Sequence, residues 1–126
     1  MIDIVGQIML YVNNQEESVK FWTEKAGFTL VSEQDNGDGM KWFVISPSKD
    51  AQTSIVLHNK ELVAKFSPGV NLETPSLLFF TRDLDQMYQD FKNKEITVGD
   101  IVEVPEGRVF NFADHEENYF AVVEKQ

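Results

Sequence analysis

The chain has 126 residues, of which 42% are hydrophobic and 12% aromatic, and its 21 acidic and 11 basic side chains give a formal net charge of −10. A chain of this length can bury the core of one domain, and the acidic balance argues against binding to nucleic acid or to an anionic membrane surface. Without cysteine the chain has neither disulfides nor thiolate chemistry. Because it also lacks an apolar run of about 20 residues and a signal-peptide pattern, we expect a cytoplasmic protein.

The first half of the chain predicts a strand, a helix and three further strands. Residues 7–12 are apolar at odd and even positions, as in a strand that is covered on both sides. An amphipathic helix follows, with a capping signal at Asn14 and a glycine stop at Gly27. The three runs that favour strands after the helix cover residues 28–32, 41–46 and 53–58.

The second half repeats this plan. Gln7 falls on Ser76 and Trp22 on Phe91, at a common offset of 69 residues (76 − 7). A strand at 76–81 precedes a helix that starts at Asp83, and the strands after it are expected near 101–104, 108–112 and 119–123. The repeat predicts an α+β fold of two βαβββ units, with a first unit at 1–60, a linker at 61–74 and a second unit at 75–126.

The strands are apolar on both faces, although a single helix can cover only one face of each sheet. In residues 41–46, for example, Trp42 and Val44 alternate with Phe43 and Ile45. The second face of each sheet must therefore curl around a ligand or contact another chain. We expect a curved mixed sheet around a cavity, and alternation alone leaves open which of the two pairs faces that cavity.

Two stretches carry a resemblance to a known family. "YVNNQEESVKFWTEKAGF" and "FNFADHEENYFAVVE" resemble motifs of the vicinal oxygen chelate superfamily, which includes glyoxalases, bleomycin resistance proteins and extradiol dioxygenases. In the second motif His115 replaces the usual proline and Glu117 the usual glycine. The resemblance implies two βαβββ units paired around a small-molecule cavity, commonly across a homodimer.

Metal enzymes of this family take four ligands, usually His, Glu or Gln, from inward-pointing strand positions. The resemblance places these positions on Gln7, Val56, Ser76 and Ala121. Valine and alanine have no donor atom, and a lone serine hydroxyl is a poor ligand for zinc or iron. We therefore predict no metal and no cofactor, and Gln7 becomes a hydrogen-bonding group in a metal-free pocket.

Alternation along the strands also predicts which side chains bind a ligand. The predicted ligand-binding residues are Gln7, Met9, Tyr11, Trp42, Val56, His58, Ser76, Leu78, Phe110, Tyr119 and Ala121. Catalytic residues stay unassigned, because no Ser-His-Asp set can be assembled. His58 is either a base or displaced ligand at the cavity rim or a solvated histidine at a strand end, and Arg108 either holds an anionic ligand group or pairs with an acid.

These observations favour a metal-free protein that binds an aromatic or cationic small molecule in a homodimer cleft, drug sequestration included. The alternative is a metal-dependent lyase or isomerase of the glyoxalase kind, or a dioxygenase, with displaced ligands such as Gln7, His58 and an acid from a partner chain. A third hypothesis is a module in which the fold serves dimerisation alone.

Overall fold

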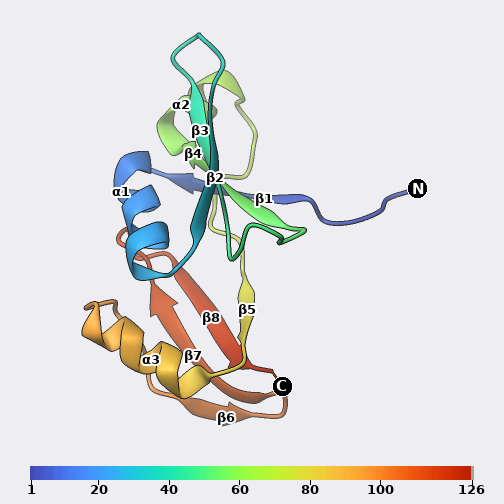
Figure 1. Ribbon diagram of the computed structural model, residues 1–126. Coiled ribbons are helices and arrows are strands. Elements are labelled where there is room, and N and C mark those ends of the chain that lie inside the picture. Colours follow the sequence, from blue (N-terminus) through green and yellow to red (C-terminus); the bar gives the residue numbers. More distant parts are fainter. Residues whose placement is uncertain (126) are drawn as a thin grey trace. The chain divides into compact units, whose positions relative to one another are not determined.

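The computed structural model describes residues 1–125, which form two compact units that meet at the Pro75–Ser76 peptide bond. Unit 1 contains β1 (Gln7–Val12), α1 (Gln15–Lys20), a π-helical turn η1 (Phe21–Lys25), β2 (Thr29–Asp35), β3 (Lys41–Ser46), β4 (Ser54–Asn59) and α2 (Lys60–Phe66). Unit 2 contains β5 (Leu78–Thr81), α3 (Leu84–Asn93), β6 (Val102–Val104), β7 (Gly107–Ala113) and β8 (Tyr119–Glu124). Each unit thus has the predicted βαβββ order (Figure 1).

The sheet of unit 1 has the strand order β1-β4-β3-β2, in which β1 runs parallel to β4 and the other neighbours are antiparallel. Its face toward α1 and η1, the helix face, holds the core of the unit. Leu10, Trp22, Ile45 and Leu57 are fully buried there, because their apolar side chains alternate in phase along three strands and meet the helical stripe. The Trp22 ring contacts the Phe28 ring edge-on at 4.9 Å between centroids.

The ends of the first helix follow the signals in the sequence. The Asn14 side chain accepts a hydrogen bond from the Glu17 amide at 3.0 Å, which confirms the predicted N-cap. At the other end Gly27 has a φ of +83°, a left-handed conformation that glycine adopts without the steric cost of a Cβ. Between them the buried Gln15 side chain donates hydrogen bonds to the carbonyls of Lys41 (2.8 Å) and Leu57 (3.0 Å). Gln15 therefore fixes the start of α1 to β3 and β4.

The sheet of unit 2 has the matching order β5-β8-β7-β6, and α3 crosses one side of β7 and β8 (Figure 1). Phenylalanine fills this helix face. The Phe91 ring on α3 meets the Phe112 ring edge-on at 5.1 Å, and Phe112 lies 5.7 Å from Phe120. Edge-to-face packing adds about 0.5–1.5 kcal/mol per pair to the burial of these rings.

Arg108 joins the start of α3 to the last strand of unit 2. Its guanidinium donates to both carboxylate oxygens of Asp85 (3.1 and 3.0 Å) and to Glu124 (3.0 Å). Glu124 in turn accepts a hydrogen bond from the Leu84 amide at 2.9 Å, the first residue of α3. Of the two roles predicted for Arg108, the structure therefore shows the ion pair with acids.

Some boundaries differ from the prediction. The segment expected to be a linker contains α2, which Asn59 caps by accepting a hydrogen bond from the Leu62 amide at 3.0 Å. The strand expected from Ser76 starts at Leu78, and β2 extends to Asp35. Within residues 1–125 no helix is long and apolar enough to span a membrane.

Candidate functional site

The face of the unit 1 sheet opposite α1, which we call its second face, is set by the strand register. Trp42 pairs with His58 and Val44 with Val56, whereas Phe43 and Ile45 belong to the core. Trp42 and Val44 are therefore the pair that lies on the second face. The strand positions in phase with them are Gln7, Met9, Tyr11, Thr29, Ser32, Gln34, Trp42, Val44, Ser46, Ser54, Val56 and His58. None of these twelve is Asp, Glu, Lys or Arg.

His58 lies at the centre of an aromatic cluster on this face. Its ring stacks on Tyr11 at 5.8 Å between centroids and lies 6.3 Å from the Trp42 ring, and its Nε2 atom is 3.1 Å from the sulfur of Met9. Burial lowers the pKa of His58 below its ordinary value of 6.5, so the imidazole is neutral at pH 7. His58 is thus a half-buried residue that contacts these three side chains.

The strand positions on the second face of the unit 2 sheet, opposite α3, also carry no ionised side chain, although the Lys125 ammonium, just after β8, lies 5.4 Å from the centroid of the Phe80 ring. Leu78 pairs with Ala121, and Ala121 pairs with Asn111, so these three share the face. The full set of strand positions in phase is Leu78, Phe80, Val102, Val104, Gly107, Val109, Asn111, Ala113, Tyr119, Ala121 and Val123. Leu78, Phe80 and Tyr119 are 52%, 66% and 59% exposed, so this face presents apolar and aromatic surface.

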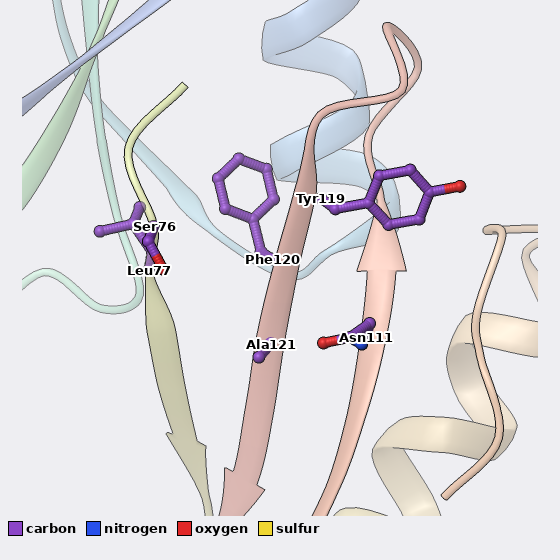
Figure 2. Close-up of a pocket in the computed structure, with 6 residues that line it drawn as sticks. All are labelled: Ser76, Leu77, Asn111, Tyr119, Phe120 and Ala121. Atoms are coloured by element: carbon purple, nitrogen blue, oxygen red, sulfur yellow. The ribbon is translucent and has the colours of Figure 1, made fainter. Parts of the chain in front are cut away.

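A pocket of about 260 Å³ opens at one end of this face. Its lining consists of Ser76, Leu77, Asn111, Tyr119, Phe120 and Ala121 (Figure 2). Figure 2 shows the Tyr119 and Phe120 rings leaving β8 in different directions, as alternation requires. The structure thus brings together the predicted residues Ser76, Tyr119 and Ala121. It adds Asn111, which sequence reasoning missed because that residue alternates with Phe110, and Phe110 was assigned to the cavity.

The predicted place of Phe110 is wrong. The side chain is 1% exposed, pairs with Val122 across the sheet, and packs edge-on against Tyr88 (5.0 Å) and Phe91 (6.0 Å) of α3. Phe110 does share a face with Arg108, as expected, but it is the helix face, since Arg108 reaches Asp85. A strand that is apolar on both faces does not reveal which face meets the helix, and a one-residue error of phase inverts the assignment.

The four family ligand positions lie on the second faces, two in each unit. Gln7 and Val56 are on neighbouring strands of unit 1, where Gln7 pairs with Ser54 and Val56 with Met9. Ser76 and Ala121 both line the unit 2 pocket. One amide, one hydroxyl and two hydrocarbon side chains do not fit a Lewis-acidic divalent ion. Within residues 1–125, no group of three or more His, Cys, Asp or Glu side chains is arranged to hold a metal.

Comparison with known proteins identifies the family. The model of the glyoxalase/bleomycin resistance protein/dioxygenase superfamily matches residues 4–122. The chain belongs to this superfamily. The match spans both βαβββ units, so it includes both second faces as well as the helices that cover the cores.

Relatives of the chain have the same length and fold. It is 27% identical over 125 residues to the uncharacterized protein YetH of Bacillus subtilis, and this alignment covers 98% of the chain and 100% of YetH. Among solved structures it resembles TnmS3, an antibiotic binding protein from a Streptomyces species, with a TM-score of 0.82, 26% identity, and coverage of 99% and 98% of the two chains. A superfamily member from Sphaerobacter thermophilus matches with a TM-score of 0.82, 25% identity and coverage of 98% of each chain.

Proposed function

We propose that this protein binds a planar aromatic small molecule, neutral or singly cationic, without a bound metal and without converting it. The observation that carries the proposal is the composition of the second faces, where Tyr11, Trp42 and His58 gather on a surface without ionised residues. Small-molecule sites are usually apolar and aromatic, with a few polar groups that orient the ligand. The Gln7 amide in unit 1 and the Asn111 amide and Tyr119 hydroxyl in unit 2 are suited to that orienting role.

The absence of carboxylates from these strand positions bears on the class of ligand. The acids that give the chain its charge of −10 lie elsewhere, so a cationic ligand would be held by aromatic rings and not by an ion pair. Stacking contributes about 0.5–1.5 kcal/mol per ring pair, and a cation over a ring about 0.5–2 kcal/mol. A neutral aromatic molecule needs no ion pair and can stack on these rings, whereas an anion finds no cationic side chain at these strand positions.

The similarity to an antibiotic binding protein supports this class of function. This similarity leads us to include the sequestration of an aromatic drug in the proposed function. Two of the four positions that hold the metal in the family's enzymes, Val56 and Ala121, have no donor atom in this chain. This favours ligand binding over the alternative of a metal-dependent lyase, isomerase or dioxygenase. In that alternative His58 would direct Nε2 at a divalent ion together with Gln7, and in the structure Nε2 contacts Met9 instead.

The proposal includes a homodimer whose partner completes the cleft. Its support is the exposed apolar surface of unit 2, where Leu78, Phe80 and Tyr119 are all more than half exposed. Contiguous apolar surface of this kind commonly marks an interface. Sedimentation velocity should give twice the chain mass, and Phe80→Asp should shift the sedimenting species to one chain. A monomer for the unmodified protein at micromolar concentration would contradict this part of the proposal.

The ligand class can be tested with a matched pair of probes. Acridone is a neutral planar tricycle, and 9-aminoacridine is a cation of similar shape at pH 7. We expect saturable binding of at least one probe, with the same affinity in the presence of EDTA. Truncation of an aromatic anchor costs about 2 kcal/mol or more, so Trp42→Ala should weaken binding about 30-fold.

The control for this experiment removes an aromatic ring from another part of unit 1. Phe66 lies on α2 and is 56% exposed, so Phe66→Ala should leave probe binding unchanged. Failure of both probes to bind, or equal losses for Trp42→Ala and Phe66→Ala, would overturn the proposal. Binding that appears only with added zinc, nickel, manganese or iron(II) would favour the metal-dependent alternative.

A further inference from the structure

We propose that Met9 and His58 together form a binding site for a soft monovalent metal ion, Cu(I) or Ag(I). This inference goes beyond the proposed function and does not depend on it, since the ion needs no aromatic ligand. It also differs from the divalent site of the metal enzymes in the family, because neither Met9 nor His58 occupies a family ligand position. The inference rests on the geometry of the pair, the chemistry of its two donor atoms and the rings beside them.

The two donor atoms already point at each other. Met9 lies on β1 and His58 on β4, and the parallel register places Met9 beside Val56 and Tyr11 beside His58. Met9 and His58 are therefore diagonal neighbours on the sheet, and the His58 Nε2 atom lies 3.1 Å from the Met9 sulfur. Both side chains come from hydrogen-bonded strands, so the sheet fixes their backbones. An ion bound between the two atoms requires them to move apart, which rotation of the two side chains allows.

The contact that the ion would replace is weak. A thioether sulfur is a poor hydrogen-bond acceptor, so the Nε2–Sδ contact contributes little stability. The other ring nitrogen of His58, Nδ1, is buried and has no hydrogen-bond partner within residues 1–125. The imidazole is therefore not anchored by a strong polar contact. It can present the Nε2 lone pair to an ion when its proton resides on Nδ1.

The donor types select the class of ion. Thioether sulfur is a soft ligand that favours Cu(I), and imidazole is a common ligand of copper. Neither donor atom brings a negative charge, because a thioether is neutral and imidazole binds metals in its neutral form. Two neutral donors cannot compensate the desolvation of a divalent ion, and Mg²⁺ and Ca²⁺ require oxygen ligands. A weakly hydrated monovalent ion that accepts two or three soft donors fits this pair.

Aromatic rings border the same point. Tyr11 stacks on His58 with an interplanar angle of 25°, and the Trp42 ring lies 6.3 Å from that of His58 at 34°. Faces of tryptophan and tyrosine attract cations within about 6 Å of the ring centroid. The second face carries no Lys or Arg on the unit 1 strands to compete with the ion, because Lys41 belongs to the helix face, where it pairs with Glu16. Met9 is 37% exposed, so solvent gives access to the sulfur.

Silver provides the test, because Ag(I) is stable in air and has the same ligand preferences as Cu(I). The full chain would be labelled with ¹³C at the methionine methyl groups and titrated with silver nitrate in a chloride-free buffer. Four methionines give four methyl signals, and each reports separately. We expect one ion per chain, a selective shift of the Met9 methyl signal, and no displacement by excess zinc.

Variants distinguish this site from adventitious binding. Removing even an indirect partner of a metal ligand weakens binding about 10- to 100-fold, so Met9→Leu and His58→Gln should each weaken silver binding at least about tenfold. Met87→Leu is the matched control, since Met87 lies on α3 of unit 2 and should leave the affinity unchanged. The thermal midpoint of each variant without silver shows whether it is folded, and a folded Met9→Leu makes the comparison valid.

Three results would overturn the inference. These are no saturable silver binding by the unmodified protein, binding that Met9→Leu leaves unchanged, and a Met87 or Met1 methyl signal that shifts before that of Met9. The outcome is separable from that of the aromatic probes, which are measured without metal. Trp42→Ala should weaken probe binding about 30-fold, but it should weaken silver binding much less, because both donor atoms remain.

Discussion

The two units build the same fold but attach their helices with different chemistry. Gln15 and Leu84 occupy equivalent positions, 69 residues apart (84 − 15), and each is the first residue of its helix. In unit 1 the neutral Gln15 amide donates to two strand carbonyls from a buried site. In unit 2 it is the backbone amide of Leu84 that donates, and the acceptor is the Glu124 carboxylate.

The cores and charges differ in the same way. Unit 1 buries Trp22 among aliphatic side chains, whereas unit 2 relies on a cluster of phenylalanines. The helix clasp of unit 2, consisting of Arg108, Asp85 and Glu124, concentrates charge at one end of its helix face. The strand positions of both second faces nevertheless carry no ionised side chain. The repeats have thus diverged in how they hold themselves together while keeping the surface that we propose binds the ligand uncharged.

The largest expected effect is the loss of one ring from the unit 2 core. Phe110→Ala should lower the free energy of unfolding by about 3–5 kcal/mol, because it removes a fully buried ring and leaves a cavity. Hydrogen exchange resolved by residue should show the loss in β7, β8 and α3.

The matched control is Phe66→Ala, which removes the same ring from a position on α2 that is 56% exposed. Exposed substitutions usually change stability by less than about 0.5 kcal/mol. Both tryptophans lie in unit 1, so tryptophan fluorescence follows that unit alone. If Phe110→Ala and Phe66→Ala destabilised the protein equally, the assignment of Phe110 to the core of unit 2 would be wrong.

The next effect separates the two units by pH. The pKa of Glu124 is lowered from 4.5 by the Leu84 amide and by Arg108, and that of Asp85 is lowered from 3.8 by Arg108. Both carboxylates therefore stabilise the folded state above their ordinary pKa values, and this contribution is lost as the pH falls through the lowered ones. In unit 1 the lowered pKa of His58 reduces stability at a higher pH than these carboxylates do. As the pH falls through about 6.5, the unfolded state starts to bind a proton while the folded state does not.

Amide exchange measured from pH 7 to pH 3 should therefore show unit 1 losing protection first and unit 2 only below pH 4.5. His58→Gln should remove the early loss. Glu124→Gln should reduce the late loss while its side-chain carbonyl still accepts the Leu84 amide. Identical pH profiles for the two units in the unmodified protein would contradict the assignment of the early loss to His58 and of the late loss to Glu124 and Asp85.

Local signals made most of the fold predictable. The helix starts at Asn14 and Asp83 follow from side chains that accept a hydrogen bond three residues on, so the sequence alone contains them. The repeat offset predicted the order of elements in unit 2 from that in unit 1. Helix α2 has a capping residue, Asn59, but its seven residues bury only Val63. Because no apolar stripe marks the segment, the sequence pattern did not predict this helix.

The site was predictable only in part, because it depends on non-local register. Alternation correctly grouped Met9 with Tyr11 on β1, but it did not decide between Trp42 and Phe43 on β3. It assigned Phe110 to the wrong face for the same reason. Only the pairing with neighbouring strands and the side on which the helix packs distinguish the faces, and both are tertiary properties. The contact of Met9 with His58 was also out of reach, since 49 residues separate them.

The smallest expected effect concerns the residue just after the C-cap of η1 in unit 1 and of α3 in unit 2. Unit 1 places Gly27 there with a φ of +83°, whereas unit 2 places Glu95 with a φ of +62°, and Glu117 has a φ of +64° in the last turn. A left-handed conformation costs a residue with a Cβ roughly 1–2 kcal/mol. Replacing that residue by glycine removes this cost, but the greater freedom of glycine in the unfolded state offsets part of the gain in stability.

Glu95→Gly should therefore stabilise the protein by about 0.5–1 kcal/mol, and Gly27→Ala should destabilise it by about 1 kcal/mol. Urea midpoints at a constant slope would measure both, with Glu103→Gly on the exposed strand β6 as a control that should not stabilise. If Glu95→Gly also fails to stabilise, the Glu95 side chain contributes a favourable contact that outweighs its backbone strain, and the two helix ends are equivalent in energy despite their different residues.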